Sequence, residues 1–266
     1  MLRNVFLKTL RDRRRSLFWW AVGLVGMTFI TVGFWPTIED SGEELNRLVE
    51  NLPPALRNLA GGELGLTSPA GYLSGRVFSF LAPILFLNFA IGFGARTLAG
   101  EEQKGTLELV LARPIPRWRV VAEKFAALTV SMFLLGAVLW ASLALGAAPV
   151  GLDIGAGPLA AAAFMVVLLG LAFGALALLV GSITGKRGLA LGITTAVAVG
   201  TYLLDLYASL SEAVEPFRGL SPFHYYDAAV PLLNGVDPAH AAFLLVITVF
   251  LAGFSLLAFE RRDVGV

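Results

Sequence analysis

The sequence predicts an all-α membrane protein that crosses the bilayer six times within a single domain, residues 1–266. Hydrophobic residues make up 57% of the chain and charged residues only 15%, and the mean hydropathy is +0.77. These values are typical of a polytopic membrane protein and not of a soluble domain. The apolar residues fall into six runs, each close to the roughly 20 residues that a helix needs to cross the hydrocarbon core.

The N-terminal arm, residues 1–16, predicts a helix that lies along the membrane surface. Leu2, Val5, Phe6 and Leu10 share one face, and basic residues occupy the others, as in interfacial helices. A basic, partly ordered tail is the alternative. The first apolar run follows without a small-residue cleavage site, so we expect a retained span and not a removed signal peptide.

The expected spans and the segments between them follow from the apolar runs. The spans cover residues 17–38, 72–99, 120–147, 158–184, 189–210 and 240–259. The segments 39–71 and 211–239 are expected to be external, with short helices at the membrane surface, because both combine apolar residues with prolines. The segment 100–117 is expected on the opposite side.

The distribution of Lys and Arg predicts the orientation. All but four of the 20 Lys and Arg residues lie in the N-terminal arm, the segment after the second span, the 185–188 turn or the C-terminal tail. The exceptions are Arg47, Arg57, Arg76 and Arg218. Positive residues favour the cytoplasmic side, so we expect a multi-pass plasma-membrane protein with both termini in the cytoplasm.

Composition and motifs argue against a metal, catalytic or nucleotide-binding site in this chain. Cysteine is absent and only two histidines occur, so we expect no metal site, and no nucleophile motif predicts a catalytic residue. The 181–187 stretch, GSITGKR, has three residues between its glycines where a phosphate loop has four, and Arg187 replaces the Mg²⁺-binding hydroxyl. We therefore expect no cofactor in this chain. A net charge of +1 gives no reason to expect nucleic acid as a partner.

Three residues near the external side are candidates for a pathway or an outer gate: Arg76, Asp205 and Tyr207. An acid within a span is a functional candidate by default. Asp205 is close enough to the span end to reach interfacial water instead, and Arg76 could be its partner. These residues leave open an ion-gradient-driven secondary transporter as an alternative function.

The segment between Arg96 and Lys124 is the most informative part of the sequence. It carries ten ionisable side chains, and burying them near a bilayer centre would cost about 25 to 35 kcal/mol. Glu101 and Glu102 suit the first turn of a helix. Leu107, Val110 and Leu111 then form an apolar stripe before Arg113-Pro114-Ile115-Pro116 ends the helix. We expect one side of this helix to rest on the bundle, with Glu102, Lys104, Glu108 and Arg113 available to another protein.

The segment EEQKGTLELVLARPIPR, residues 101–117, resembles the cytoplasmic loop of type-2 permeases of ATP-binding-cassette (ABC) transporters. In that family the loop joins the second and third of six spans and forms a coupling helix against an ATPase subunit. The resemblance extends to the basic N-terminal helix and to Ser221-Pro222-Phe223 before the last span. It implies that Glu101, Glu102, Gly105, Thr106 and Glu108 couple the chain to an ATPase, with Arg113 and Arg117 at the helix exit.

The resemblance also implies partners. They are a cytosolic ABC ATPase that carries ATP and Mg²⁺, and a second permease subunit in a homo- or heterodimer, all embedded among membrane lipids. The expected function is export of a hydrophobic or amphipathic substrate, because the spans offer mostly aliphatic and aromatic surface. A membrane anchor or assembly subunit without transport of its own stays open as a further alternative.

Overall fold

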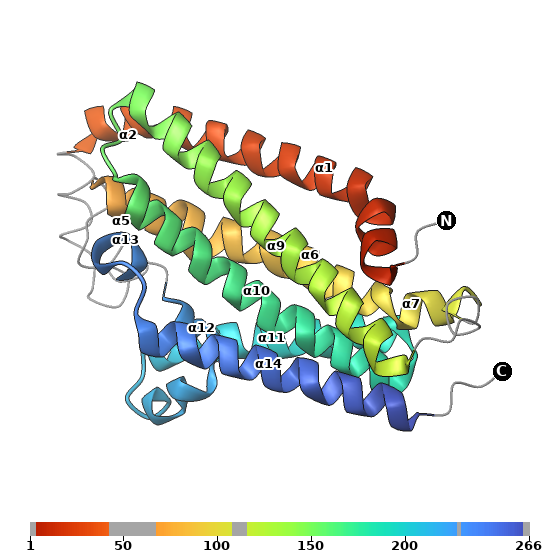
Figure 1. Cartoon of the computed structure of the whole chain (residues 1–266). Helices are drawn as coiled ribbons and strands as arrows, with labels where there is room; N and C mark the ends of the chain where they lie inside the picture. The colour runs from red at the N-terminus through yellow and green to blue at the C-terminus, as the bar shows by residue number, and fades with distance from the viewer. Residues whose placement is uncertain (1–3, 43–67, 108–115, 228–229, 263–266) are drawn as a thin grey trace.

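A computed structural model describes residues 4–42, 68–107, 116–227 and 230–262. These residues form helices, turns and short connections without a β-strand. Six helical stretches are long and apolar enough to cross a membrane, which confirms the predicted all-α, six-span class. The first helix begins and the last one ends at the same end of the bundle (Figure 1). We call this the terminal end and the opposite one the loop end.

The first span is a single long helix, α1 (Val5–Gly33), continued by α2 (Trp35–Asp40). Asn4 caps it, since its side-chain oxygen accepts a hydrogen bond from the Phe6 N–H at 2.9 Å. The predicted interfacial helix is therefore not a separate element. It forms the first turns of α1, which bend sharply away from the rest of that helix (Figure 1).

The second span combines three helical segments: α5 (Pro69–Leu73), η2 (Ser74–Leu81) and α6 (Ala82–Thr97). The middle segment, η2, is a π-helix. Pro83, in the first turn of α6, has no N–H to donate to the turn before it, which favours a widened backbone at that point. The short helix α7 (Ala99–Glu102) follows at the terminal end.

The remaining spans are α9 (Arg117–Ala147), extended by η3 (Ala148–Val150), then α10 (Ala156–Thr184), α11 (Arg187–Ala208) and α14 (Pro238–Arg261). Gly185 ends α10 with a φ of +63°, a conformation that glycine adopts without a steric penalty. Asp237 caps α14 by accepting hydrogen bonds from the N–H groups of Ala239 and His240, and these bonds lower the pKa of Asp237.

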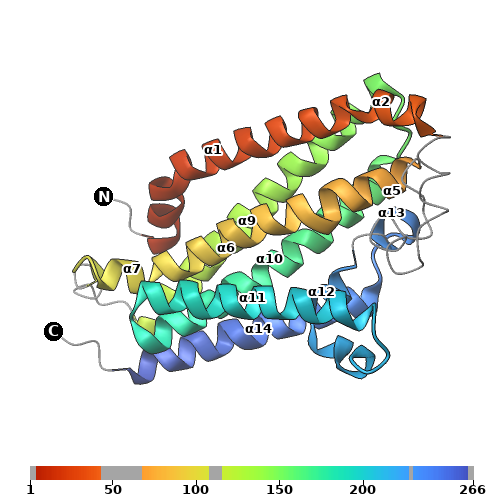
Figure 2. The ribbon, with the colours of Figure 1, turned by 180° about the vertical axis from the view of Figure 1, so that it is seen from behind.

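Helix α10 occupies the centre of the bundle and packs against α6, α9, α11 and α14 (Figures 1 and 2). Small residues bring these helices close together. A Cβ placed on Gly94 of α6 would lie 2.4 Å from the carbonyl oxygen of Gly174 in α10. On another face of α10, the Ser182 hydroxyl lies 2.8 Å from that of Ser255 in α14. Close approach of this kind is typical of membrane helix packing.

Three short helices close the loop end: η4 (Glu215–Leu220), α12 (Pro222–Tyr226) and α13 (Val230–Asn234). Two buried tyrosines form hydrogen bonds between different helices at this end. The Tyr226 hydroxyl donates to the Phe78 carbonyl of η2, and the Tyr72 hydroxyl donates to the Thr31 carbonyl of α1, each at 2.7 Å. The segment 211–239 thus holds the short helices that its sequence predicts, while most of the first loop, residues 43–67, lies outside the described residues.

Candidate functional site

The candidate coupling segment begins at the terminal end, where the second span runs into α7 (Figure 2). The structure describes Glu101, Glu102, Gly105, Thr106 and Arg117 of the predicted coupling residues. Glu108 and Arg113 lie outside the described residues, as do Val110 and Leu111, so most of the expected amphipathic helix stays a prediction. Leu107 is buried, and with Leu98, Val120, Val121 and Phe259 it forms an apolar cluster beneath the segment.

Glu101 binds a buried lysine. Its Oε2 lies 2.7 Å from Nζ of Lys124, whose side chain is 1% exposed. The same ammonium donates a hydrogen bond to the carbonyl oxygen of Thr97, the last residue of α6. A buried ammonium without such partners would carry a large desolvation cost. Glu101 therefore compensates a charge inside the bundle and joins α7 to α9.

Glu102 is also bound within the chain. Arg262 holds its carboxylate with both terminal nitrogens, Nη1 to Oε2 at 3.0 Å and Nη2 to Oε1 at 2.5 Å. This two-point geometry is the strongest form of a carboxylate–guanidinium pair. Arg117, predicted at the helix exit, donates to the Arg262 backbone carbonyl at 2.7 Å. The expectation that Glu102 is available to a partner is therefore wrong, because the end of α14 already occupies it.

Gly105 and Thr106 form the C-terminal cap of α7. Gly105 has a φ of +67°. Its N–H donates to the Glu102 carbonyl at 2.9 Å, and the Thr106 N–H donates to the Glu101 carbonyl at 3.0 Å. These two bonds are those of a Schellman motif, in which glycine ends a helix in the left-handed conformation. Gln103, Lys104, Gly105 and Thr106 are exposed, so the turn presents a polar surface at the terminal end.

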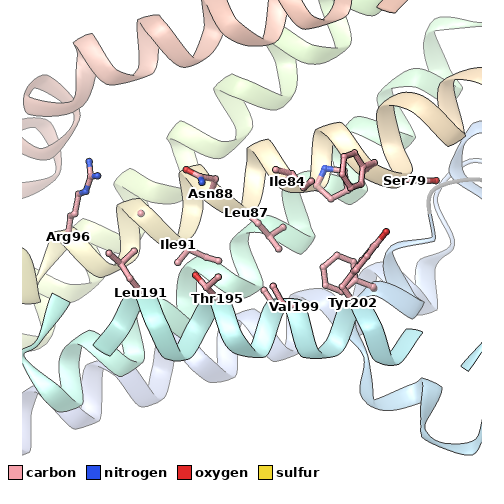
Figure 3. Close-up of a pocket in the computed structure, with 15 residues that line it drawn as sticks. Ser79, Ile84, Leu87, Asn88, Ile91, Arg96, Leu191, Thr195, Val199 and Tyr202 are labelled. Carbon is pink, nitrogen blue, oxygen red and sulfur yellow. The ribbon is translucent and has the colours of Figure 1, made fainter. Parts of the chain in front are cut away.

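A second feature is a lateral groove of about 470 Å³ between α6 and α11. Its walls are mainly apolar, with Leu87 and Ile91 facing Leu191 and Val199, and Asn88 and Thr195 add polar groups along its length (Figure 3). Neither of these two polar side chains forms a hydrogen bond within the part of the chain that the structure describes. Asn88 did not figure among the sequence candidates, although an amide within an apolar run was a visible signal.

The three gate candidates do not form one site. Asp205 pairs with Arg218, whose Nε lies 3.1 Å from Oδ1 of the carboxylate. Arg76 is exposed on η2 and forms no ion pair with Asp205, and the Tyr207 side chain is 59% exposed on α11. The suggested pairing of Arg76 with Asp205 is therefore wrong, because an arginine from the nearby η4 supplies the counter-charge.

The described part of the chain holds no group of three or more His, Cys, Asp or Glu side chains able to bind a metal ion. His224 and His240 do lie close together, with ring centroids 5.7 Å apart, but they pack against Tyr225. The arrangement is an aromatic cluster at the loop end.

Comparison with known proteins agrees with the architecture. A search of curated proteins found no match. A family model described as "ABC-2 family transporter protein" matches residues 3–264, which is nearly the whole chain. Six membrane-spanning helices, with a structured segment between the second and third, are consistent with that match. The chain belongs to the ABC-2 family of transporter proteins and is a multi-pass membrane permease.

Proposed function

We propose that the chain is the membrane subunit of an ATP-driven exporter in the plasma membrane. It works with a second permease subunit, identical or different, and with separate cytosolic ATPase subunits that bind ATP and Mg²⁺. The single observation that carries this proposal is the way in which the segment after the second span is bound to the helices of the bundle. Two of its carboxylates are fixed to α9 and to the end of α14, so a force applied to the segment would act on the bundle.

The terminal end is the cytoplasmic side in this proposal. Most of the Lys and Arg residues that the structure describes are at that end, including those in the N-terminal turns of α1, in the 185–188 turn and at the end of α14. Positive residues are retained on the cytoplasmic side of membrane proteins. The exposed turn of Gln103, Lys104, Gly105 and Thr106 then faces the compartment in which ATP is available.

The second permease subunit is proposed to pack beside α11. This helix is the least buried of the six spans. Gly188, Gly192 and Gly200 leave open space on it, since a Cβ at any of them would meet no atom within 4 Å. Small residues at this spacing let a second helix approach closely. The groove between α6 and α11 would then lie at the subunit boundary, and its apolar walls suit a hydrophobic or amphipathic substrate.

The test is purification of the tagged chain from its native membrane, followed by reconstitution in liposomes. We expect a cytosolic protein with a phosphate loop to co-purify and ATP hydrolysis to depend on the permease. Lys104→Glu reverses an exposed charge and should weaken ATPase association roughly fivefold. Lys8→Glu, an equal change on an exposed residue of α1, is the matched control.

Two outcomes would overturn the proposal. Transport by liposomes that contain this chain alone, driven by an ion gradient, would establish a secondary transporter. A stable complex without ATP-dependent transport of any compound in a broad hydrophobic panel would establish an anchor or assembly subunit.

A further inference from the structure

Three arginines from three different helices converge near the terminal end of the lateral groove. Arg96, in the last turn of α6, is part of the groove lining and lies at the end of its row of labelled residues (Figure 3). Arg13 of α1 places its guanidinium carbon 5.0 Å from the ring centroid of Phe93, one turn earlier in α6. Arg187 begins α11, and its Cδ would lie 3.7 Å from a Cβ placed on Gly100.

These arginines lack a counter-charge among the described residues. Arg13 is within electrostatic range of both other arginines, and the acids that reach it are Glu101 and the exposed Asp12. Glu101 is already bound to the buried Lys124 at 2.7 Å. In the part of the chain that the structure describes, no carboxylate forms an ion pair with Arg13, Arg96 or Arg187. The cluster therefore carries excess positive charge.

Arg187 is the arginine whose hydrogen-bond donors are least satisfied within the described residues. Its Nε is buried and has no hydrogen-bond partner among the described residues. The residue also begins α11, so its cation lies at the positive end of the helix dipole, where an anion is favoured. Among the described residues, no side chain caps this helix start. The guanidinium and the free N–H groups of the first turn of α11 can both donate hydrogen bonds to a bound anion.

The surroundings define the kind of anion. One member of the cluster, Arg96, lines a groove whose walls, formed by Leu87, Ile91 and Leu191, are apolar. A ligand that fits both regions has a phosphate at one end and a hydrocarbon chain at the other. Guanidinium groups bind phosphate oxygens with two parallel hydrogen bonds. Basic pockets between membrane helices bind anionic lipid headgroups.

We propose that Arg13, Arg96 and Arg187 bind the phosphate of an anionic phospholipid, with its acyl chain in the groove between α6 and α11. The site rests on the proposed function for its orientation, which places it in the cytoplasmic leaflet, and it shares the groove that the proposed function offers to a substrate. The lipid would sit where α1, α6 and α11 meet beside the coupling segment, and would stabilise that junction.

The test uses native mass spectrometry of the delipidated full-length chain, titrated with phosphatidylglycerol or with phosphatidylcholine. We expect selective binding of phosphatidylglycerol. Arg96→Gln and Arg187→Gln should each weaken that binding roughly fivefold, the contribution of one charge near a membrane surface. Arg14→Gln is the matched control, because Arg14 is an exposed neighbour of Arg13. Arg96 is itself exposed, so its variant serves if Arg187→Gln does not fold.

Two results would overturn the proposal. An equal loss in Arg14→Gln would mean that phosphatidylglycerol follows general surface charge and not this cluster. Displacement of the lipid by millimolar inorganic phosphate would mean that the site takes a free anion. The measurement needs no ATPase, so its failure leaves the proposed export function standing, and loss of ATP coupling leaves the lipid site standing.

Discussion

The ammonium of Lys124 lies 2.7 Å from Oε2 of Glu101, and the lysine is buried whereas the glutamate is partly exposed. The pair connects a span of the bundle to the short helix after the second span. It gives Glu101 a structural role that is independent of any partner protein. A Glu101 variant could lose activity because the fold is destabilised or because coupling is lost. The stability of each Glu101 variant must therefore be measured alongside its activity.

Glu101→Gln should destabilise the chain by about 3 kcal/mol, because it leaves a buried ammonium without its counter-charge. Glu101→Gln combined with Lys124→Met should recover most of that stability, since the buried charge is removed as well. Thermal unfolding in detergent, followed by tryptophan fluorescence, measures both variants. A double variant as unstable as the single one would contradict the assigned role of the pair.

Glu102→Gln should cost less stability than Glu101→Gln, because both partners of the Glu102–Arg262 pair are partly solvent-exposed. The unfolding free energy should fall by about 1 kcal/mol. Permease-dependent ATP hydrolysis should fall more steeply, since the segment then loses its ion pair with the end of α14 and keeps the pair of Glu101 with Lys124. The effect of Arg262→Gln should be similar and should not add to that of Glu102→Gln. Additive losses would show that the two residues act separately.

Gly94→Ala should lower the stability of the bundle by about 1 to 3 kcal/mol, because its Cβ would overlap the backbone of α10. Gly92→Ala is the control two residues away. A Cβ there meets no atom within 4 Å, so alanine should raise stability by up to about 1 kcal/mol through helix propensity. The melting temperatures of the two variants should move in opposite directions. Equal shifts would contradict the close α6–α10 contact.

The pKa of His224 should rise when Arg218 is replaced by Gln. Burial lowers the pKa of His224 below its ordinary value of 6.5, and the charge of Arg218 lowers it further. The substitution removes that cation and frees Asp205, whose carboxylate raises the His224 pKa. In the wild type, the unfolded chain takes up this proton first as pH falls below about 6.5, so folding stability decreases from there downward.

Nitrogen NMR of the ¹⁵N-labelled imidazoles can follow this titration, because the chain has only two histidines. A His224→Gln variant identifies which of the two signals belongs to His224. A His224 pKa that stays unchanged or falls in Arg218→Gln would contradict the assigned electrostatics of this cluster.

The six spans were predictable because each depends on a local property, a run of apolar residues long enough to cross the bilayer. Ion pairs between residues far apart in the chain could not be predicted from the sequence. Glu102 and Arg262 are 160 positions apart, and a single sequence gives no signal that joins them. From the sequence, Arg262 counted only as a positive charge at the C-terminal end.

Lys124 could have been placed more accurately. Val120, Val121, Ala127 and Leu128 are buried on α9, and their helical spacing puts position 124 on the same face. A lysine on an apolar face needs a carboxylate, and the segment just before α9 offers three, Glu101, Glu102 and Glu108. From the sequence, Lys124 counted as one of ten charges too costly to bury, which is why its burial was missed.

The contact between Gly94 and Gly174 has a mechanical consequence. The carbonyl oxygen of Gly174 occupies the volume that a side chain at position 94 would fill, so α6 and α10 have little room to approach each other further at this point. Because the two helices also pack against each other extensively, we expect them to move together as a unit about 24 Å long over the 16 residues of α6. A displacement of α7 at the terminal end is then expected to reach the π-helix at the loop end.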